Sequence, residues 1–339
     1  MTMPEPTLTY DEAFAPYWHP VAYAEEVGEK PVAARLLGRD LVVWRTASGL
    51  AATDRYCAHR GADLSRAKVL GERLQCEYHG WEYGRDGACA HIPAQPRAPI
   101  PARARIGGYL VQERYHLVWV CLAPEPKLPL PDWSALDAPG VAVAKLPPME
   151  WNISAGRWLE NLVDATHLSW VHRDTFGNAR HTEVEPYDVQ VLPHGIRCEF
   201  RYPAVSPAHK GQENPKVDMT GLKYDVQWPF SGRLEFKPTI FFAHTIHLAA
   251  CPVAEDKMVG FYFASYDKRL TMFPGLFVKQ ELAIIEEDRV VLERQKSPAL
   301  PLTFDGEVHL RADRMGVEYR RGLTRIRLGT DTPAPTFEG

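Results

Sequence analysis

Two Cys/His pairs lie close together in the first third of the chain. Cys57 is followed by His59, and after sixteen further residues Cys76 is followed by His79. Structural zinc fingers usually place two cysteines in one half of the site and two histidines in the other. One Cys and one His in each half is typical of a [2Fe-2S] cluster in which two thiolates hold one iron and two imidazoles hold the other. The spacing therefore predicts such a cluster on these four residues, with a structural zinc site as the alternative.

A second group of possible metal ligands lies near the middle of the chain, at Asp164, His167 and His172. On a continuous helix Glu160, Asp164 and His167 would share one face. His172 would point about 140° away from His167, so the helix must end or bulge between them if both bind one metal. Two neutral imidazoles and one carboxylate, with coordination positions left open, form the ligand set of Fe(II) oxygenases.

The carboxylate of that set is expected far along the chain, on a helix predicted for residues 277–295. Its apolar stripe is formed by Ile284, Ile285, Val291 and Leu292. Asp288 lies at the centre of the stripe, whereas Glu287 is expected to point elsewhere. A carboxylate on an apolar face costs several kcal/mol unless it is paired or binds a metal. Asp288 is therefore the expected third ligand, and Glu287 is the alternative.

Length and composition indicate the number of domains and exclude several classes of partner. The chain has 339 residues, 45% of them hydrophobic, which predicts about two globular domains. A formal net charge of −4 argues against nucleic acid as a partner. The N-terminal residues have neither the basic nor the apolar region of a secretory signal, and no apolar run approaches a membrane span. A cytoplasmic protein with no membrane partner is expected, and its six cysteines are too sparse for a disulfide framework.

The elements that must position the sites form two groups. Short strands, including a hairpin over residues 109–122, predict a small β domain over residues 13–125. A proline-rich linker is expected at about residues 123–149, because proline at this density prevents both a helix and a central strand. The second domain, residues 126–335, is expected to have a helix at 157–170, strands through 186–268, and helices at 277–295 and 310–322. Strands grouped between helices indicate an α+β fold.

The cluster motif resembles that of the Rieske non-haem iron oxygenases, the alpha subunits of ring-hydroxylating oxygenases. The similar segments are Cys57-Ala58-His59-Arg60, Cys76-Glu77-Tyr78-His79-Gly80-Trp81 and Glu287-Asp288-Arg289-Val290-Val291. The resemblance extends over nearly the whole chain and is nearest to the phthalate-dioxygenase-like branch, with its N- and O-demethylases and monohydroxylases. It implies an all-β Rieske domain followed by a helix-grip (START/Bet v 1-like) catalytic domain, in which a curved antiparallel sheet surrounds a long C-terminal helix.

The resemblance also implies a reaction. Electrons from NAD(P)H would reach the cluster through a separate flavin/iron–sulfur reductase, with or without a ferredoxin. They would pass on to Fe(II) at His167, His172 and Asp288, where O2 oxidises a small aromatic or polycyclic substrate by monohydroxylation or demethylation. The chain itself has no G-x-G-x-x-G after a strand, so no nicotinamide site of its own is evident. The alternatives are a cis-dihydroxylating dioxygenase, a Rieske electron carrier without oxygenase activity, and a helix-grip binding module.

Three further expectations concern the surroundings of the iron. In the family that the chain resembles, the aspartate at the position of Asp164 bridges a cluster histidine of one subunit to an iron-ligand histidine of the next, which implies a homotrimer. Asn161 is expected beside the iron ligands. An apolar substrate pocket is expected between the sheet and the long helix, with a lining drawn from Phe241, Phe242, Phe261 and Phe263.

Overall fold

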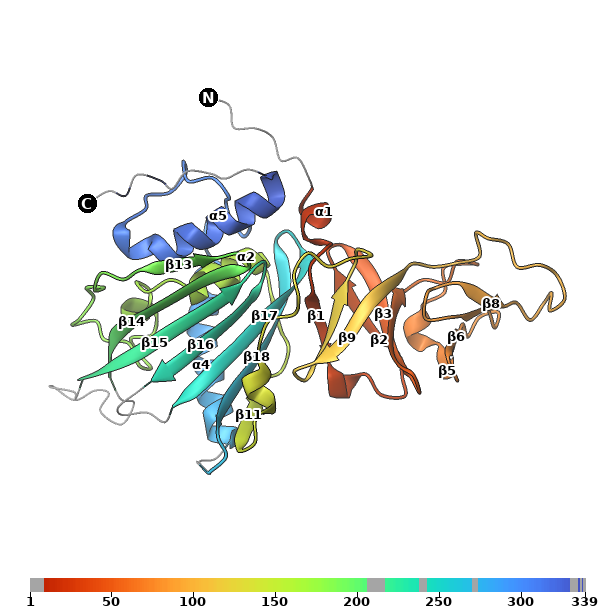
Figure 1. Cartoon of the computed structure of the whole chain (residues 1–339), viewed down its shortest axis with the longest axis horizontal. Coiled ribbons are helices and arrows are strands. Elements are labelled where there is room, and N and C mark those ends of the chain that lie inside the picture. Colours follow the sequence, from red (N-terminus) through yellow and green to blue (C-terminus); the bar gives the residue numbers. More distant parts are fainter. Residues whose placement is uncertain are drawn as a thin grey trace. The chain divides into compact units, whose positions relative to one another are not determined.

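The computed structural model describes residues 9–205, 217–237, 243–269 and 274–329, together with residues 335 and 337. The chain divides into two compact units, one over Tyr10–Leu130 and the other from Pro131 onward. Both units are built largely from antiparallel strands (Figure 1).

The N-terminal unit consists of two sheets. The larger has six strands in the order β1-β10-β9-β4-β3-β2. Their bounds are β1 (His19–Tyr23), β2 (Val32–Leu36), β3 (Arg39–Thr46), β4 (Gly49–Asp54), β9 (Gly108–Arg114) and β10 (Leu117–Cys121). The smaller sheet, in the order β5-β6-β7-β8, consists of β5 (Lys68–Leu70), β6 (Arg73–Gln75), β7 (Glu82–Tyr83) and β8 (Cys89–His91). A short helix, α1 (Tyr10–Phe14), precedes the sheets, and the 3-10 turns η1 (Ala24–Glu26) and η2 (Leu64–Arg66) lie between strands.

Apolar runs form the core of this unit. The side chains of residues 41–44 in β3 are fully buried. The expected hairpin is present as β9 and β10, and its turn is formed by Tyr115 and His116, both with positive φ. A two-residue turn of this kind matches the twist of the strands that it joins.

The C-terminal unit is built on one eight-stranded antiparallel sheet. Seven strands follow the order β11-β18-β17-β16-β15-β14-β13, and β12 pairs with β18. Their bounds are β11 (Val141–Lys145), β12 (Met149–Trp151), β13 (Val189–Leu192), β14 (Gly195–Val205), β15 (Val217–Gln227), β16 (Ser231–Lys237), β17 (His244–Ala254) and β18 (Lys257–Asp267). Side chains of β14 alternate between buried and exposed along much of its length, as expected when one face of a sheet is covered.

Helices cover this sheet. They are α2 (Ala155–Leu162), α3 (Leu168–Val171), α4 (Pro274–Leu292) and α5 (Arg314–Leu328), with the 3-10 turns η3 (Ser134–Asp137) and η5 (Arg311–Asp313). The long helix α4 crosses one face of the sheet (Figure 1). The expected α+β class, with a curved sheet around a long C-terminal helix, is confirmed.

Three details differ from the sequence-based expectations. The segment expected as linker includes β11, an edge strand whose neighbouring prolines lie outside the hydrogen-bonded ladder with β18. The helix expected at residues 157–170 is interrupted between α2 and α3. Val291, placed on the buried stripe of α4, is 45% exposed, because at 3.6 residues per turn it lies about 120° from the buried Ile285, whereas Leu292 lies on the same side as Ile285.

None of the helices in the described part of the chain is long and apolar enough to cross a membrane.

Candidate metal sites

Two loops of the N-terminal unit are built alike. One follows β4 and carries Cys57 and His59, and the other follows β6 and carries Cys76 and His79. In each loop a glycine four residues after the cysteine adopts φ +68° and donates its amide to the cysteine carbonyl, at 2.9 Å in the first loop and 3.0 Å in the second. Glycine adopts this left-handed conformation without a steric penalty. The two tight turns therefore present their Cys and His side chains in equivalent ways.

The side chains of these loops gather at one place. Cys57 and Cys76 are buried in the same core cluster, and the rings of His59 and His79 lie 4.5 Å apart. Trp81 stacks on His59 at 4.7 Å, so the tryptophan covers one side of the site. The Nδ1 atom of His59 is buried and has no hydrogen-bond partner among the described residues. A buried nitrogen without a partner fits an imidazole whose lone pair binds a metal.

Tyr83 was not identified from the sequence as part of this site. Its hydroxyl lies 3.1 Å from the Cys57 Sγ atom and accepts a hydrogen bond from the Ala58 amide. Burial raises the pKa of Tyr83 far above its usual value, so the phenol stays protonated and can donate to the sulfur. The position of Tyr83, two residues after Trp81, follows no spacing pattern that would have marked it as part of the site.

Three atoms from two distant segments converge in the C-terminal unit. His167 and His172 flank α3, and Asp288 comes from α4. The two Nε2 atoms are 3.2 Å apart, and Asp288 Oδ1 lies 3.6 Å from that of His167 and 3.3 Å from that of His172. The Oδ1 atom is buried and has no hydrogen-bond partner in the described residues. Two imidazole nitrogens and a carboxylate oxygen around one point fit a divalent metal of the iron type.

Local structure explains why the two histidines can meet. The Asp164 carboxylate accepts hydrogen bonds from the amide and the hydroxyl of Thr166, both at 2.7 Å. This side-chain turn competes with helix continuation and separates α2 from α3. A single helical turn then joins His167 to His172, and the helix ends there, as the expected convergence on one metal required. Since the helix is interrupted, the continuous face predicted for Glu160, Asp164 and His167 is wrong, and Glu160 instead pairs with Arg157 and Arg320.

Glu287 contributes to the site in a way that the sequence did not predict. It was expected to point elsewhere, yet its Oε2 lies 2.9 Å from His172 Nδ1 and accepts a hydrogen bond from the Thr175 hydroxyl at 2.8 Å. A carboxylate at Nδ1 holds the proton there and leaves Nε2 available to a metal. Burial lowers the pKa of His172 to about 3, so its ring is neutral at physiological pH. Burial also raises the pKa of Asp288.

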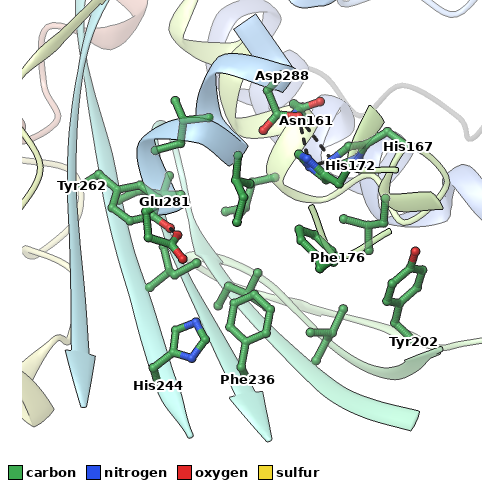
Figure 2. Close-up of a pocket in the computed structure, with 18 of the residues that line it drawn as sticks. Asn161, His167, His172, Phe176, Tyr202, Phe236, His244, Tyr262, Glu281 and Asp288 are labelled. Carbon is green, nitrogen blue, oxygen red and sulfur yellow. Dashed lines mark hydrogen bonds and ion pairs between the residues drawn. The ribbon is translucent and has the colours of Figure 1, made fainter. Parts of the chain in front are cut away.

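Asp164 and Asn161 lie next to this trio. Asp164 Oδ2 is 3.7 Å from His167 Nδ1, and its side chain is 35% exposed, so one carboxylate is reachable from both the site and the surface. Asn161, from the end of α2, hydrogen-bonds Asp288 and lowers its pKa against the larger effect of burial. Figure 2 shows Asn161 beside Asp288 and the two histidines.

A mainly apolar cavity of about 160 Å³ opens beside the trio, between α4 and the sheet. Its walls include Leu222 of β15, Phe236 of β16, Ile246 of β17 and Ile285 of α4. A cavity of this volume is large enough for a molecule the size of a single aromatic ring. Phe261 and Phe263 are buried but do not line it, because they pack within the core, and Phe241 and Phe242 lie outside the described residues.

Comparison with known proteins identifies the class to which the fold and these sites belong. Residues 17–109 match the model of the Rieske [2Fe-2S] domain, and residues 151–328 match that of the vanillate O-demethylase oxygenase C-terminal domain. The chain therefore belongs to the Rieske oxygenase family, in the phthalate-dioxygenase-like demethylase branch, and the resemblance inferred from the motifs is confirmed. Its members are oxidoreductases that carry the cluster and Fe(II) and use O2 with electrons from NAD(P)H through a reductase.

One relative matches nearly the whole chain, and another matches about a third of it. Methylxanthine N1-demethylase NdmA of Pseudomonas putida is 30% identical over 92% of this chain and 88% of its own length. The structure of NdmA with caffeine superimposes with a TM-score of 0.83, at 27% identity, over 93% of this chain and 91% of NdmA. The oxidoreductase NdmD of the same organism is 36% identical over 33% of this chain, which is 20% of NdmD.

Proposed function

We propose that His167, His172 and Asp288 bind a single Fe(II) at the wall of the apolar pocket, and that Cys57, His59, Cys76 and His79 hold the [2Fe-2S] cluster. The observation that carries the proposal is the convergence of two Nε2 atoms and one carboxylate oxygen within 3.2–3.6 Å of one another. That oxygen is buried and has no hydrogen-bond partner among the described residues. Three protein ligands on one side leave coordination positions open toward the pocket.

Each neighbouring residue has a defined task in this proposal. When bound, the iron would activate O2, which by itself reacts only slowly with organic molecules. Glu287 fixes the tautomer of His172, and Asn161 holds Asp288 in place. The leucine and isoleucine side chains of the pocket exclude water and hold an apolar substrate against the open positions.

The proposed reaction is monohydroxylation or oxidative demethylation of a small aromatic substrate. It is supported by the size of the cavity and by the similarity to NdmA, which is named as a methylxanthine N1-demethylase and whose structure contains caffeine. A cis-dihydroxylating reaction remains the alternative, and the number of oxygen atoms transferred from 18O2 to product separates the two.

The proposed partners follow from the same relationships. A separate reductase, of the kind that NdmD represents, delivers the electrons to the cluster. The protein is proposed to be cytoplasmic. We further propose a homotrimer in which Asp164 connects the cluster of one subunit to the iron of the next. The partly exposed position of Asp164 beside His167 supports this role.

The test is iron analysis combined with turnover. The purified chain should hold about three irons, two of them in the cluster. Asp288→Ala should leave the cluster spectrum unchanged, reduce the iron content to about two, and abolish O2-dependent oxidation across a panel of methylated purines and methoxybenzoates. An Asp288→Ala variant that keeps its third iron and its activity would refute the proposed site.

A further inference from the structure

An acidic side chain lies inside the apolar pocket, away from the proposed iron ligands. Glu281 is 6% exposed and lines the cavity, and Tyr262 donates a hydrogen bond to its Oε2 atom. Figure 2 shows Glu281, Tyr262 and His244 at the opposite end of the pocket from Asp288, with the Glu281 carboxyl group directed into the cavity. Within the described residues, no Lys or Arg forms an ion pair with Glu281. The proposed chemistry at the iron makes no use of this carboxyl group.

The position of Glu281 along α4 sets its distance from the iron ligands. Residues 281 and 288 are seven apart, two helical turns, so they share one face and lie about 10 Å apart along the axis. Ile284 and Ile285 line the pocket between them. The pocket thus has a proposed metal at one end, an apolar middle and an acidic group at the other end.

We propose that Glu281, held by Tyr262, is a specificity-determining residue that binds a protonated amine at the end of the substrate remote from the carbon to be oxidised. The inference rests on the proposed function, because it assumes that the substrate fills this pocket. It narrows the substrate class to small aromatic or alicyclic molecules that carry a basic nitrogen at the end remote from the oxidised carbon.

The contacts of the carboxyl group favour a cation over an anion. Ionised, it accepts hydrogen bonds through both oxygens, and Tyr262 satisfies only Oε2. Burial raises the pKa of Glu281 to about 7, so near neutral pH a substantial fraction is ionised, and an ammonium group beside it would increase that fraction. The rings of Phe236 and Phe277 border the same end, and aromatic faces attract cations.

His244 is the group that could reverse this preference. It lines the same end, stacked on Phe236 at 4.4 Å. If the Glu281 carboxyl were protonated and the His244 ring charged, a carboxylate substrate would bind instead. The experiment therefore compares ligands of both charges.

The test measures binding to the cluster- and iron-loaded enzyme without O2, so that no turnover is needed. Three probes of nearly equal shape are titrated calorimetrically: 4-methoxyphenethylamine, its neutral isostere 1-methoxy-4-propylbenzene, and the anion 3-(4-methoxyphenyl)propionate. The native enzyme should bind the amine at least about tenfold more tightly than the neutral probe, and the anion most weakly. Glu281→Gln should abolish the preference while changing the affinity for the neutral probe by less than about threefold. Glu286→Gln, at an exposed position of the same helix, is the matched control and should behave as the native enzyme.

Several results would overturn the inference: preferential binding of the anion, equal affinity for the amine and its isostere, no binding of the amine, or an unchanged preference in Glu281→Gln. If Glu281→Gln does not fold, Glu281→Asp should retain a preference for the amine, and its loss there counts against the role of the carboxylate. A failure of the proposed iron site would instead appear as a missing third iron in the native enzyme, which the iron assay detects independently of these affinities.

Discussion

At His172 a single carboxylate determines which ring nitrogen can bind a metal. Glu287 lies 2.9 Å from Nδ1, so the proton stays on that nitrogen and Nε2 faces His167 and Asp288. Partners of this kind typically change metal affinity by about 10–100-fold when they are removed.

Replacing that carboxylate should therefore weaken iron binding without affecting the cluster. Glu287→Gln is expected to raise the dissociation constant for Fe(II) by about 10–100-fold. The measurement is an anaerobic Fe(II) titration, with the visible spectrum of the cluster as the internal reference. Glu286→Gln, one residue earlier and exposed, should leave both unchanged. Native-like iron affinity in Glu287→Gln would mean that the hydrogen bond has no such role.

His247 gives a pH prediction away from the metal sites. It is fully buried in β17, its Nε2 is 3.0 Å from Ser265 Oγ, and burial lowers its pKa to about 3. An unfolded chain holds this proton with a pKa of about 6.5. Between these values the unfolded state binds a proton that the folded state does not, so stability falls as the pH drops below about 6.5.

At pH 5 this residue alone should cost about 2 kcal/mol of unfolding free energy relative to pH 7.5. Urea unfolding at both pH values checks this. His247→Gln keeps a hydrogen-bonding group near Ser265 but does not titrate. The unfolding free energy that this variant loses between pH 7.5 and pH 5 should therefore be about 2 kcal/mol smaller than the loss in the native protein. Identical losses in the two proteins would show that His247 is protonated without penalty.

At the scale of the elements, α5 is positioned by a close contact with the loop after β15. A Cβ atom at Gly322 would lie 2.0 Å from two atoms of the Trp228 indole. Trp228 is itself buried, so the ring cannot move aside at little cost. The contact requires glycine at this position of the helix.

Gly322→Ala should therefore destabilise the protein by about 1–3 kcal/mol, even though alanine is the better helix former. Gly316→Ala, on the same helix, is the matched control. Its Cβ would meet only Glu160 atoms at 3.7 Å, an ordinary contact, so a neutral or slightly stabilising effect is expected. Denaturant unfolding of the two variants separates the contact from helix propensity, and equal stabilities would contradict the tight packing.

At the scale of the whole molecule, the proposed trimer makes a prediction that single variants cannot test. If the cluster of one subunit reduces the iron of the next, a chain without a working cluster and a chain without a working iron site should complement each other. The two variants are His79→Ala, which lacks a working cluster, and His167→Ala, which lacks a working iron site. In a ring formed by a repeated head-to-tail contact, the intact cluster of one chain can lie next to the intact iron site of the other.

Mixed and reassembled trimers should recover part of the native turnover, and dilution should not abolish the recovered activity. Asp164→Asn should keep both metals and the trimer, yet slow reduction of the iron in stopped-flow measurements. Folded hybrids without activity, or a fully active native monomer, would exclude transfer between subunits.

The sequence by itself predicted the chemistry of both proposed metal sites. A local pattern indicates cluster binding by Cys57, His59, Cys76 and His79. Helix periodicity indicates that Asp288 faces inward. The alternation of strands and the long helix indicated the fold class, because periods of 2 and 3.6 residues directly reflect which faces are buried.

Only the tertiary structure decided how these residues are supported and what surrounds them. Glu287 was predicted to point away from the buried stripe of α4. Its contact with His172, which lies 115 residues earlier in the chain, is one that no local pattern encodes. The Asp164–Thr166 turn that separates α2 from α3 is a competition between side-chain and backbone hydrogen bonds, which a continuous helical pattern conceals. In the sequence Glu281 is one of many helical glutamates, and its place inside the pocket follows only from the packing of α4 against the sheet.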